Sequence, residues 1–116
     1  MIGVDFSRTA VYLRPGRTDM RKQVNGLSLI AGEQMAQDPL SGNLFLFCNR
    51  ERRILKALYW DRNGFCLWQK RLERDKFPWP DSEEAARAIS GEELRMLLDG
   101  IDFFHAHRSV SFQSVS

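Results

Sequence analysis

Apolar residues gather in four short runs that are typical of β-strands. The runs cover residues 10–14, 44–48, 53–61 and 65–72, and each is bounded by residues that favour turns. The stretch Phe77-Pro78-Trp79-Pro80 follows the last run, and its two prolines would remove hydrogen-bond donors from an interior strand. We therefore predict four strands followed by an extended segment that leaves the sheet.

Two helices are predicted from the spacing of apolar residues. Apolar residues recur every three or four positions from Met20 to Met35, with Thr18 as the predicted N-cap of this helix. A second helix is predicted after Ser90-Gly91-Glu92-Glu93, a capping-box pattern in which the serine and glutamate side chains bond free backbone donors. Gly100 is the predicted C-terminal cap of that helix.

The dipeptide Asn63-Gly64 predicts a hairpin between the two longest strands. Both residues tolerate the positive φ angles of a two-residue type I′ turn. With this turn, Lys56 faces Arg71 and Trp60 faces Leu67 on one side of the hairpin. The other side is the predicted core face, which carries Tyr59, Trp68 and Leu72.

Together these elements predict an α+β fold, in which a small, mainly antiparallel sheet with a central hairpin packs against about two helices. A chain of 116 residues fits one domain with one core. We expect that domain to span residues 1–116, with its core at about 10–103 and an extended or frayed tail over 104–116.

Charge is distributed unevenly along the chain, although the formal net charge is only +2. Residues 50–76 contain nine lysines and arginines against four acidic residues, whereas residues 77–102 contain seven acidic residues against two arginines. This pattern indicates either a surface for a polyanion beside a surface for a basic partner, or a fold that neutralises itself.

The hairpin supplies the first candidate binding surface. Lys56, Trp60, Gln69 and Arg71 share one predicted face, where cations, an amide and an aromatic ring could meet phosphates and a stacked base. Lys70, which the same register places on the other face opposite Ala57, is a further candidate phosphate contact. The alternative is that Trp60 packs beneath a helix while the charges are solvated.

The predicted start of the first helix supplies the second candidate surface. Arg14, Arg17, Arg21 and Lys22 cluster there, although cations at this end oppose the helix dipole. Backbone N–H groups joined by arginine side chains can hold a phosphate. The alternative is that Asp19 and solvent offset the charge.

The sequence predicts neither catalysis nor a cofactor. Its acidic residues are scattered, and it has no phosphate-cradling glycine loop and no nucleophile motif. Cys48 and Cys66 lie in apolar runs and are expected to be reduced core residues. Their combination with His105 and His107 matches no common zinc spacing, so we expect no metal.

The longest apolar run is too short to span a bilayer, and the first residues lack the features of a signal peptide. No exporting signal supplies an oxidising compartment for the cysteines. We therefore expect a cytoplasmic protein that does not bind membranes.

A series of ordered sequence blocks resembles one bacterial family, the accessory protein of the IS sixty-six group of insertion sequences. This protein is the TnpB-type product of the second open reading frame, and the resemblance covers about residues 10–103. It implies a role in DNA transposition beside a separate, larger DDE-type transposase, and it carries over no catalytic residue. The blocks, in order, are 11–13, 15–22, 38–42, 44–47, 58–61, 63–67, 70–72, 77–80 and 97–102.

The residues and the resemblance together favour a non-catalytic accessory protein for transposition. In the leading hypothesis it binds DNA at the terminal inverted repeats of the element and assists the transposase. Its phosphate contacts would then be Arg17, Arg21, Lys22, Lys56, Lys70 and Arg71. In the alternative it is a protein–protein adaptor that docks the transposase without contacting DNA, through Glu83, Glu84, Glu92 and Glu93.

Overall fold

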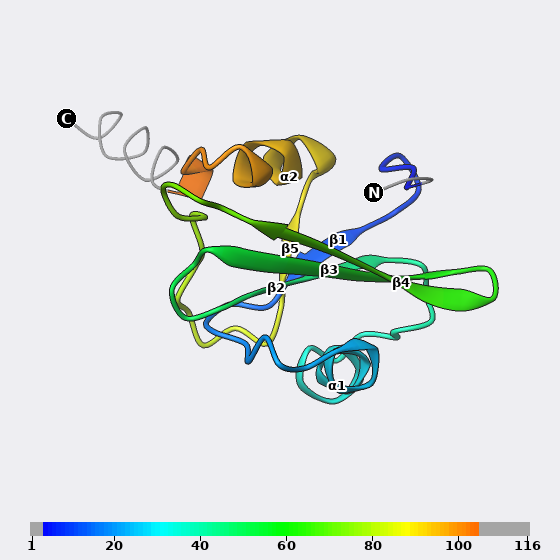
Figure 1. The fold of residues 1–116 in the computed structure, drawn as a ribbon. Helices are drawn as coiled ribbons and strands as arrows, with labels where there is room; N and C mark the ends of the chain where they lie inside the picture. The colour runs from blue at the N-terminus through cyan, green and yellow to red at the C-terminus, as the bar shows by residue number, and fades with distance from the viewer. Residues whose placement is uncertain (1–3, 105–116) are drawn as a thin grey trace.

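The computed structural model describes residues 4–104 and forms one open five-stranded sheet with a helix on each face (Figure 1). Among the described strands, β1 and β2 run parallel and every other neighbouring pair is antiparallel. This arrangement confirms the predicted α+β fold. The spatial order is β4-β3-β2-β1-β5, and the strands are β1 (Val11–Leu13), β2 (Leu44–Cys48), β3 (Ile54–Asp61), β4 (Gly64–Arg71) and β5 (Arg87–Ile89).

Each face of the sheet carries its own apolar cluster, because alternate residues of a strand point to opposite sides. On one face, Phe45, Phe47 and Leu58 pack against Leu27 of α1 (Val24–Leu29). On the other face, α2 (Gly91–Leu98) contributes Leu94 and Leu97. Strand β2 is buried along its whole length, as expected of a strand that is covered on both faces.

The hairpin register differs from the prediction. The two loop residues are Arg62 and Asn63, so Trp60 pairs with Phe65 and Lys56 pairs with Gln69. This register avoids the like-charge pair of Lys56 with Arg71. It also gives Trp60 and Phe65 an edge-to-face contact, with ring centroids 5.1 Å apart. The shift moves β4 by two residues, so each side chain keeps its predicted face, and Tyr59, Trp68 and Leu72 do pack in the α2-side cluster.

The first helix begins later than predicted. Its first residue is Val24, and Gln23 rather than Thr18 is the N-cap. The helix then continues into a π-helical turn, η1 (Ile30–Gln34), so its end near Met35 agrees with the prediction. Residues 18–22 form a loop instead, because the Lys56 ammonium group bonds the backbone carbonyl oxygens of Met20 and Lys22 at 2.8 and 2.9 Å.

The second helix is capped as predicted. The Glu93 backbone N–H donates to the Ser90 hydroxyl oxygen, and the Ser90 N–H donates to the Glu93 carboxylate, each at 3.0 Å. At the other end, Gly100 has a φ of +78°, and the N–H groups of Gly100 and Ile101 bond the carbonyls of Leu97 and Met96. These two bonds form a Schellman motif, which satisfies carbonyls that the helix leaves free.

We predict that Gly100→Ala lowers the free energy of unfolding by about 1 kcal/mol, because a side chain in the left-handed region is strained. The matched control is Gly64→Ala. A Cβ at either position meets nothing within 4 Å, but Gly64 lies outside that region of φ. Urea titration of both variants measures the difference, and equal losses would contradict the assignment of the cost to backbone conformation.

Candidate functional site

One end of the sheet gathers several chain segments. The parallel strands β1 and β2 both finish there, and β4, which is antiparallel to β3, finishes there as well. The loops that follow β1 and β2 lie side by side, because Arg14 N–H donates to the Leu46 carbonyl and Thr18 N–H donates to the Cys48 carbonyl, at 3.0 and 2.8 Å. Clefts beyond the carboxyl ends of parallel strands are common ligand sites.

The segment Phe77–Pro80 crosses this end of the sheet. The chain must pass from β4 at one edge of the sheet to β5 at the other edge. This segment is the part of the connection that runs past the ends of the strands. The Trp79 indole N–H donates to the carbonyl oxygens of Arg14 and Gly16 at 2.9 and 3.0 Å. Phe77 N–H donates to the Arg52 carbonyl at 2.7 Å. The prediction of an extended, non-strand exit is therefore confirmed, and both aromatic side chains are buried.

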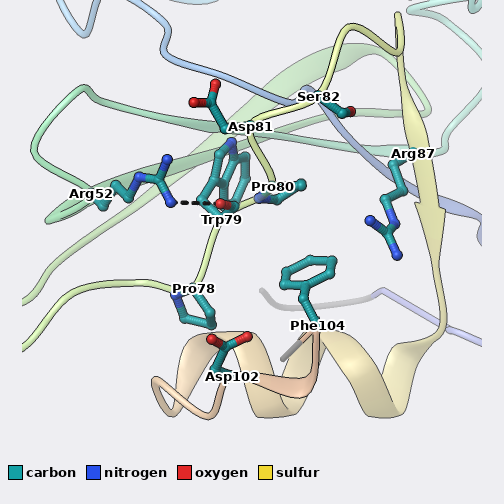
Figure 2. A pocket seen from close by; sticks show the side chains of 9 residues that line it. All are labelled: Arg52, Pro78, Trp79, Pro80, Asp81, Ser82, Arg87, Asp102 and Phe104. Carbon is teal, nitrogen blue, oxygen red and sulfur yellow. Dashed lines mark hydrogen bonds between the residues drawn. The ribbon is translucent and has the colours of Figure 1, made fainter. Parts of the chain in front are cut away.

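Three adjoining cavities lie at this end of the sheet, and the crossing segment lines the first two. The first, of about 320 Å³, is lined by Arg52, Trp79, Arg87 and Phe104 among others (Figure 2). The second, of about 240 Å³, shares Arg52 and Trp79 with the first. The third, of about 460 Å³, shares with the second the residues Arg17, Asn49 and Arg50. Because neighbours share their walls, we treat the three as one arginine groove, lined by Arg17, Arg50, Arg52 and Arg87.

None of the four groove arginines has an ion-pair partner among residues 4–104. Arg52 donates to the Trp79 carbonyl oxygen at 2.6 Å, a bond visible in Figure 2, and its φ of +62° is unusual for a residue with a side chain. The Arg87 guanidinium lies over the Phe104 ring at 4.7 Å. Two arginines of the groove are thus held in place by neutral partners.

Two acidic residues near the groove are already engaged. The Asp19 carboxylate pairs with Arg21 at 2.7 Å, and hydrogen bonds from the Arg21 side chain and backbone lower the pKa of Asp19 to about 2. Glu51 accepts a hydrogen bond from the Asn49 side-chain amide at 3.2 Å. Asp102 lines the groove at the end near Arg87, and Asp81 lines both the first and the second cavity. Neither carboxylate lines the third cavity, where Arg17 and Arg50 meet.

Lys56 is not a surface residue, which corrects its assignment as a phosphate contact. Its side chain is 2% exposed, and its ammonium group is held by the Met20 and Lys22 carbonyls. Burial lowers the pKa of Lys56 from its ordinary value. Lys56 instead fixes the loop before α1. The predicted phosphate site at the start of this helix is therefore also corrected, because Arg17, Arg21 and Lys22 lie on that loop and not at the first turn of α1.

The structure separates the other predicted contacts of the hairpin. Trp60 pairs near the turn, whereas Arg71 pairs with Ile54, six residues along β3 and about 20 Å away. Arg71 bonds Glu73 at 3.0 Å. Lys70 donates to the Leu98 carbonyl at the end of α2, at 2.9 Å. Gln69 stays exposed between them, so the hairpin residues do not form one compact site.

The acidic residues proposed for partner binding lie in the loop before β5 and in the first turn of α2. Glu83 and Glu84 are exposed in the loop before β5, and Glu92 is exposed in the first turn of α2. Glu93 is committed to the capping box. The acidic segment ends up at the β5 edge and on α2, whereas the basic segment holds the opposite, β4 edge.

The cysteines are free thiols within the described chain. Cys48 is fully buried, and burial raises its pKa to about 12, while Cys66 is half-buried. Within residues 4–104 no three His, Cys, Asp or Glu side chains converge as metal ligands would. His105, His107 and the predicted tail after Phe104 lie outside the described residues, whereas Phe104 itself packs against the α2-side cluster. The same region contains no helix with the length and apolarity needed to cross a membrane.

Sequence reasoning missed Arg50, Arg52 and Arg87 as site residues. They come from the loop between β2 and β3 and from β5, two segments that only the strand order brings together. The available signal was the position of Arg50 and Arg52 directly after an apolar strand, which would have required knowing that β1 and β2 are parallel. Strand β5 itself was not predicted, because three residues show no alternation.

Fold and groove together define a small three-layer α+β protein with a cationic cleft at the carboxyl ends of its two parallel strands. The profile of the IS66 Orf2-like proteins matches residues 9–108. The chain belongs to this family, which confirms the resemblance to the IS sixty-six group and gives the protein an accessory role in transposition.

Two relatives from Sinorhizobium fredii (strain NBRC 101917 / NGR234) are similar over most of the chain. Uncharacterized protein y4hO is 44% identical over 95 residues, which cover 82% of this chain and 83% of the relative. Uncharacterized protein y4jC is 34% identical over 90 residues, which cover 78% and 77%. No solved structure is significantly similar to the chain.

We predict that Trp79→Phe lowers the free energy of unfolding by about 1–3 kcal/mol, because the Arg14 and Gly16 carbonyls lose their shared donor. Trp68→Phe is the matched control, since the Trp68 indole has no hydrogen-bond partner among the described residues but also packs in the α2-side cluster. Chemical denaturation compares the two variants. Equal losses would show that ring volume, and not the two hydrogen bonds, secures the crossing segment.

Proposed function

We propose that the protein binds element-end DNA through the arginine groove and thereby assists the separate transposase. The observation that carries this proposal is the pair Arg17 and Arg50. They come from the two loops that follow β1 and β2, line the same concave surface, and have no carboxylate partner in the described chain. Unpaired arginines on one surface are the usual means of binding nucleic-acid phosphates.

The geometry around the pair supports the same function. Lys22 is exposed on the loop that also carries Arg17, so it extends the cationic surface away from the groove, whereas Arg21 on the same loop is paired with Asp19. The buried Lys56 ammonium group fixes this loop. A cationic loop held in one conformation loses less conformational entropy when it binds DNA. Trp60, Gln69 and Arg71 are spread along the hairpin and do not form a comparable surface.

We predict that Arg17→Ala with Arg50→Ala weakens binding to duplex DNA by at least about tenfold near 0.1 M salt. Loss of two phosphate contacts should also reduce the slope of log affinity against log salt by about 2. The measurement is a mobility-shift titration with terminal-repeat and scrambled duplexes at several salt concentrations.

The matched control for this titration is Arg62→Ala with Arg71→Ala, which removes the same charge from the hairpin. It should leave the salt slope within about 0.5 of the wild type. If the control loses affinity and the groove variant does not, the hairpin is the DNA surface. If the wild type binds neither duplex at low salt, DNA binding itself is excluded.

A second function, as an adaptor that docks the transposase, is favoured by the acidic β5 edge. Glu83, Glu84 and Glu92 are exposed and have no ion-pair partner among residues 4–104. They lie across the sheet from the basic β4 edge. A basic surface of the transposase would be complementary to them.

We predict that Glu83→Lys, Glu84→Lys and Glu92→Lys together abolish co-purification with the transposase if the adaptor function holds, because the contact would become repulsive. Glu93 is left unchanged, since its carboxylate caps α2. Glu33→Lys, on the opposite face near α1, serves as the control and should retain the complex. Co-purification that survives the triple variant would exclude this surface.

A further inference from the structure

The third cavity of the arginine groove has the donors of a site for one phosphate group. It lies between residues 17–20, which follow β1, and residues 49–51, which follow β2, and its volume is about 460 Å³. We propose that this cavity holds a single phosphate of the DNA backbone in a fixed position, with Thr18, Arg17 and Arg50 as the groups that bind it. The inference rests on the proposed DNA binding and identifies its anchoring contact.

Thr18 carries the first argument for a ligand. The residue is 5% exposed and belongs to the wall of the cavity, yet its buried hydroxyl oxygen has no hydrogen-bond partner among the described residues. Because this oxygen has almost no accessible surface, it binds a ligand in the cavity only after the side chain rotates toward it. Buried hydroxyl groups are almost always bonded, because an unsatisfied one loses its interaction with water. The backbone N–H of Thr18 is bonded to the Cys48 carbonyl at 2.8 Å, which fixes the residue at the end of β2.

The charges around Thr18 indicate the kind of ligand. Arg17 and Arg50 line the same cavity without an ion-pair partner among the described residues. Of the two carboxylates in the wall, Asp19 is ion-paired with Arg21, whereas Glu51 accepts a hydrogen bond from the neutral Asn49 amide and keeps its charge. Two arginines without an ion-pair partner against one such carboxylate favour an oxyanion over a metal ion.

A phosphate fits these donors better than a single carboxylate does. Its oxygens point in several directions, so one group can accept from a hydroxyl and from guanidinium groups on different loops. Such a contact would fix the position of the DNA backbone on the protein, whereas mobile surface lysines would only attract it. Such a site would therefore fix where the groove sits along the DNA backbone.

Titration with inorganic phosphate tests the site, with sodium chloride added to keep the ionic strength constant. Amide chemical shifts of residues 17–20 and 49–51 should saturate with phosphate in the wild type. Thr18→Val keeps the shape and removes the hydroxyl, and it should weaken phosphate binding at least about fivefold. Thr18→Ser restores the hydroxyl and should bind within about twofold of the wild type. Thermal unfolding of each variant verifies that the fold is retained.

The outcomes separate the site from the proposed function. Equal phosphate affinity in the wild type and Thr18→Val, or no saturable shift at all, would overturn the phosphate site and leave water as the partner of Thr18. If duplex DNA then still binds in an Arg17- and Arg50-dependent way, the proposed function survives. If phosphate binds in a Thr18-dependent way but DNA does not, the site takes free phosphate and the DNA contact is overturned.

Discussion

The passage of the chain from β4 to β5 is the constraint on which the rest of the structure depends. These two strands lie at opposite edges of the sheet, so residues 72–86 must cross all the others. The crossing is secured by hydrogen bonds of Phe77 and Trp79 with Arg52, Arg14 and Gly16. Because the crossing segment runs past the ends of the parallel strands, it forms one wall of the arginine groove.

A second constraint comes from the burial of one cation. Lys56 lies on a strand that is covered on both faces, and its charge needs oxygen partners in place of water. The carbonyl oxygens of Met20 and Lys22 supply them, which unwinds what the sequence pattern predicts as the first turn of a helix. The loop formed in this way carries Arg17, Arg21 and Lys22 at the groove end of the sheet. A residue that cannot touch DNA thereby shapes the surface proposed to bind it.

Much of the fold could be predicted from the sequence, but less of the candidate site could be. Strands β2, β3 and β4 and both caps of α2 follow local rules of period, turn and capping chemistry, which neighbouring residues satisfy by themselves. The predicted register of the hairpin is wrong by two residues. The cross-strand pairs of β3 and β4 outweigh the preference of Asn63-Gly64 for the two turn positions. The burial of Lys56 and the position of the groove depend on which segments meet across the sheet. The spacing of residues along the chain does not predict those meetings.

The central claim is that DNA meets the end of the sheet where β1 and β2 finish. Titration of the isotopically labelled protein with a terminal-repeat duplex tests this claim most directly, because every backbone amide reports its own change in chemical shift. We predict that the largest changes fall in residues 14–22, 49–53 and 77–87, with little change at the hairpin turn. Changes centred on residues 60–67, and absent from the three groove segments, would contradict it.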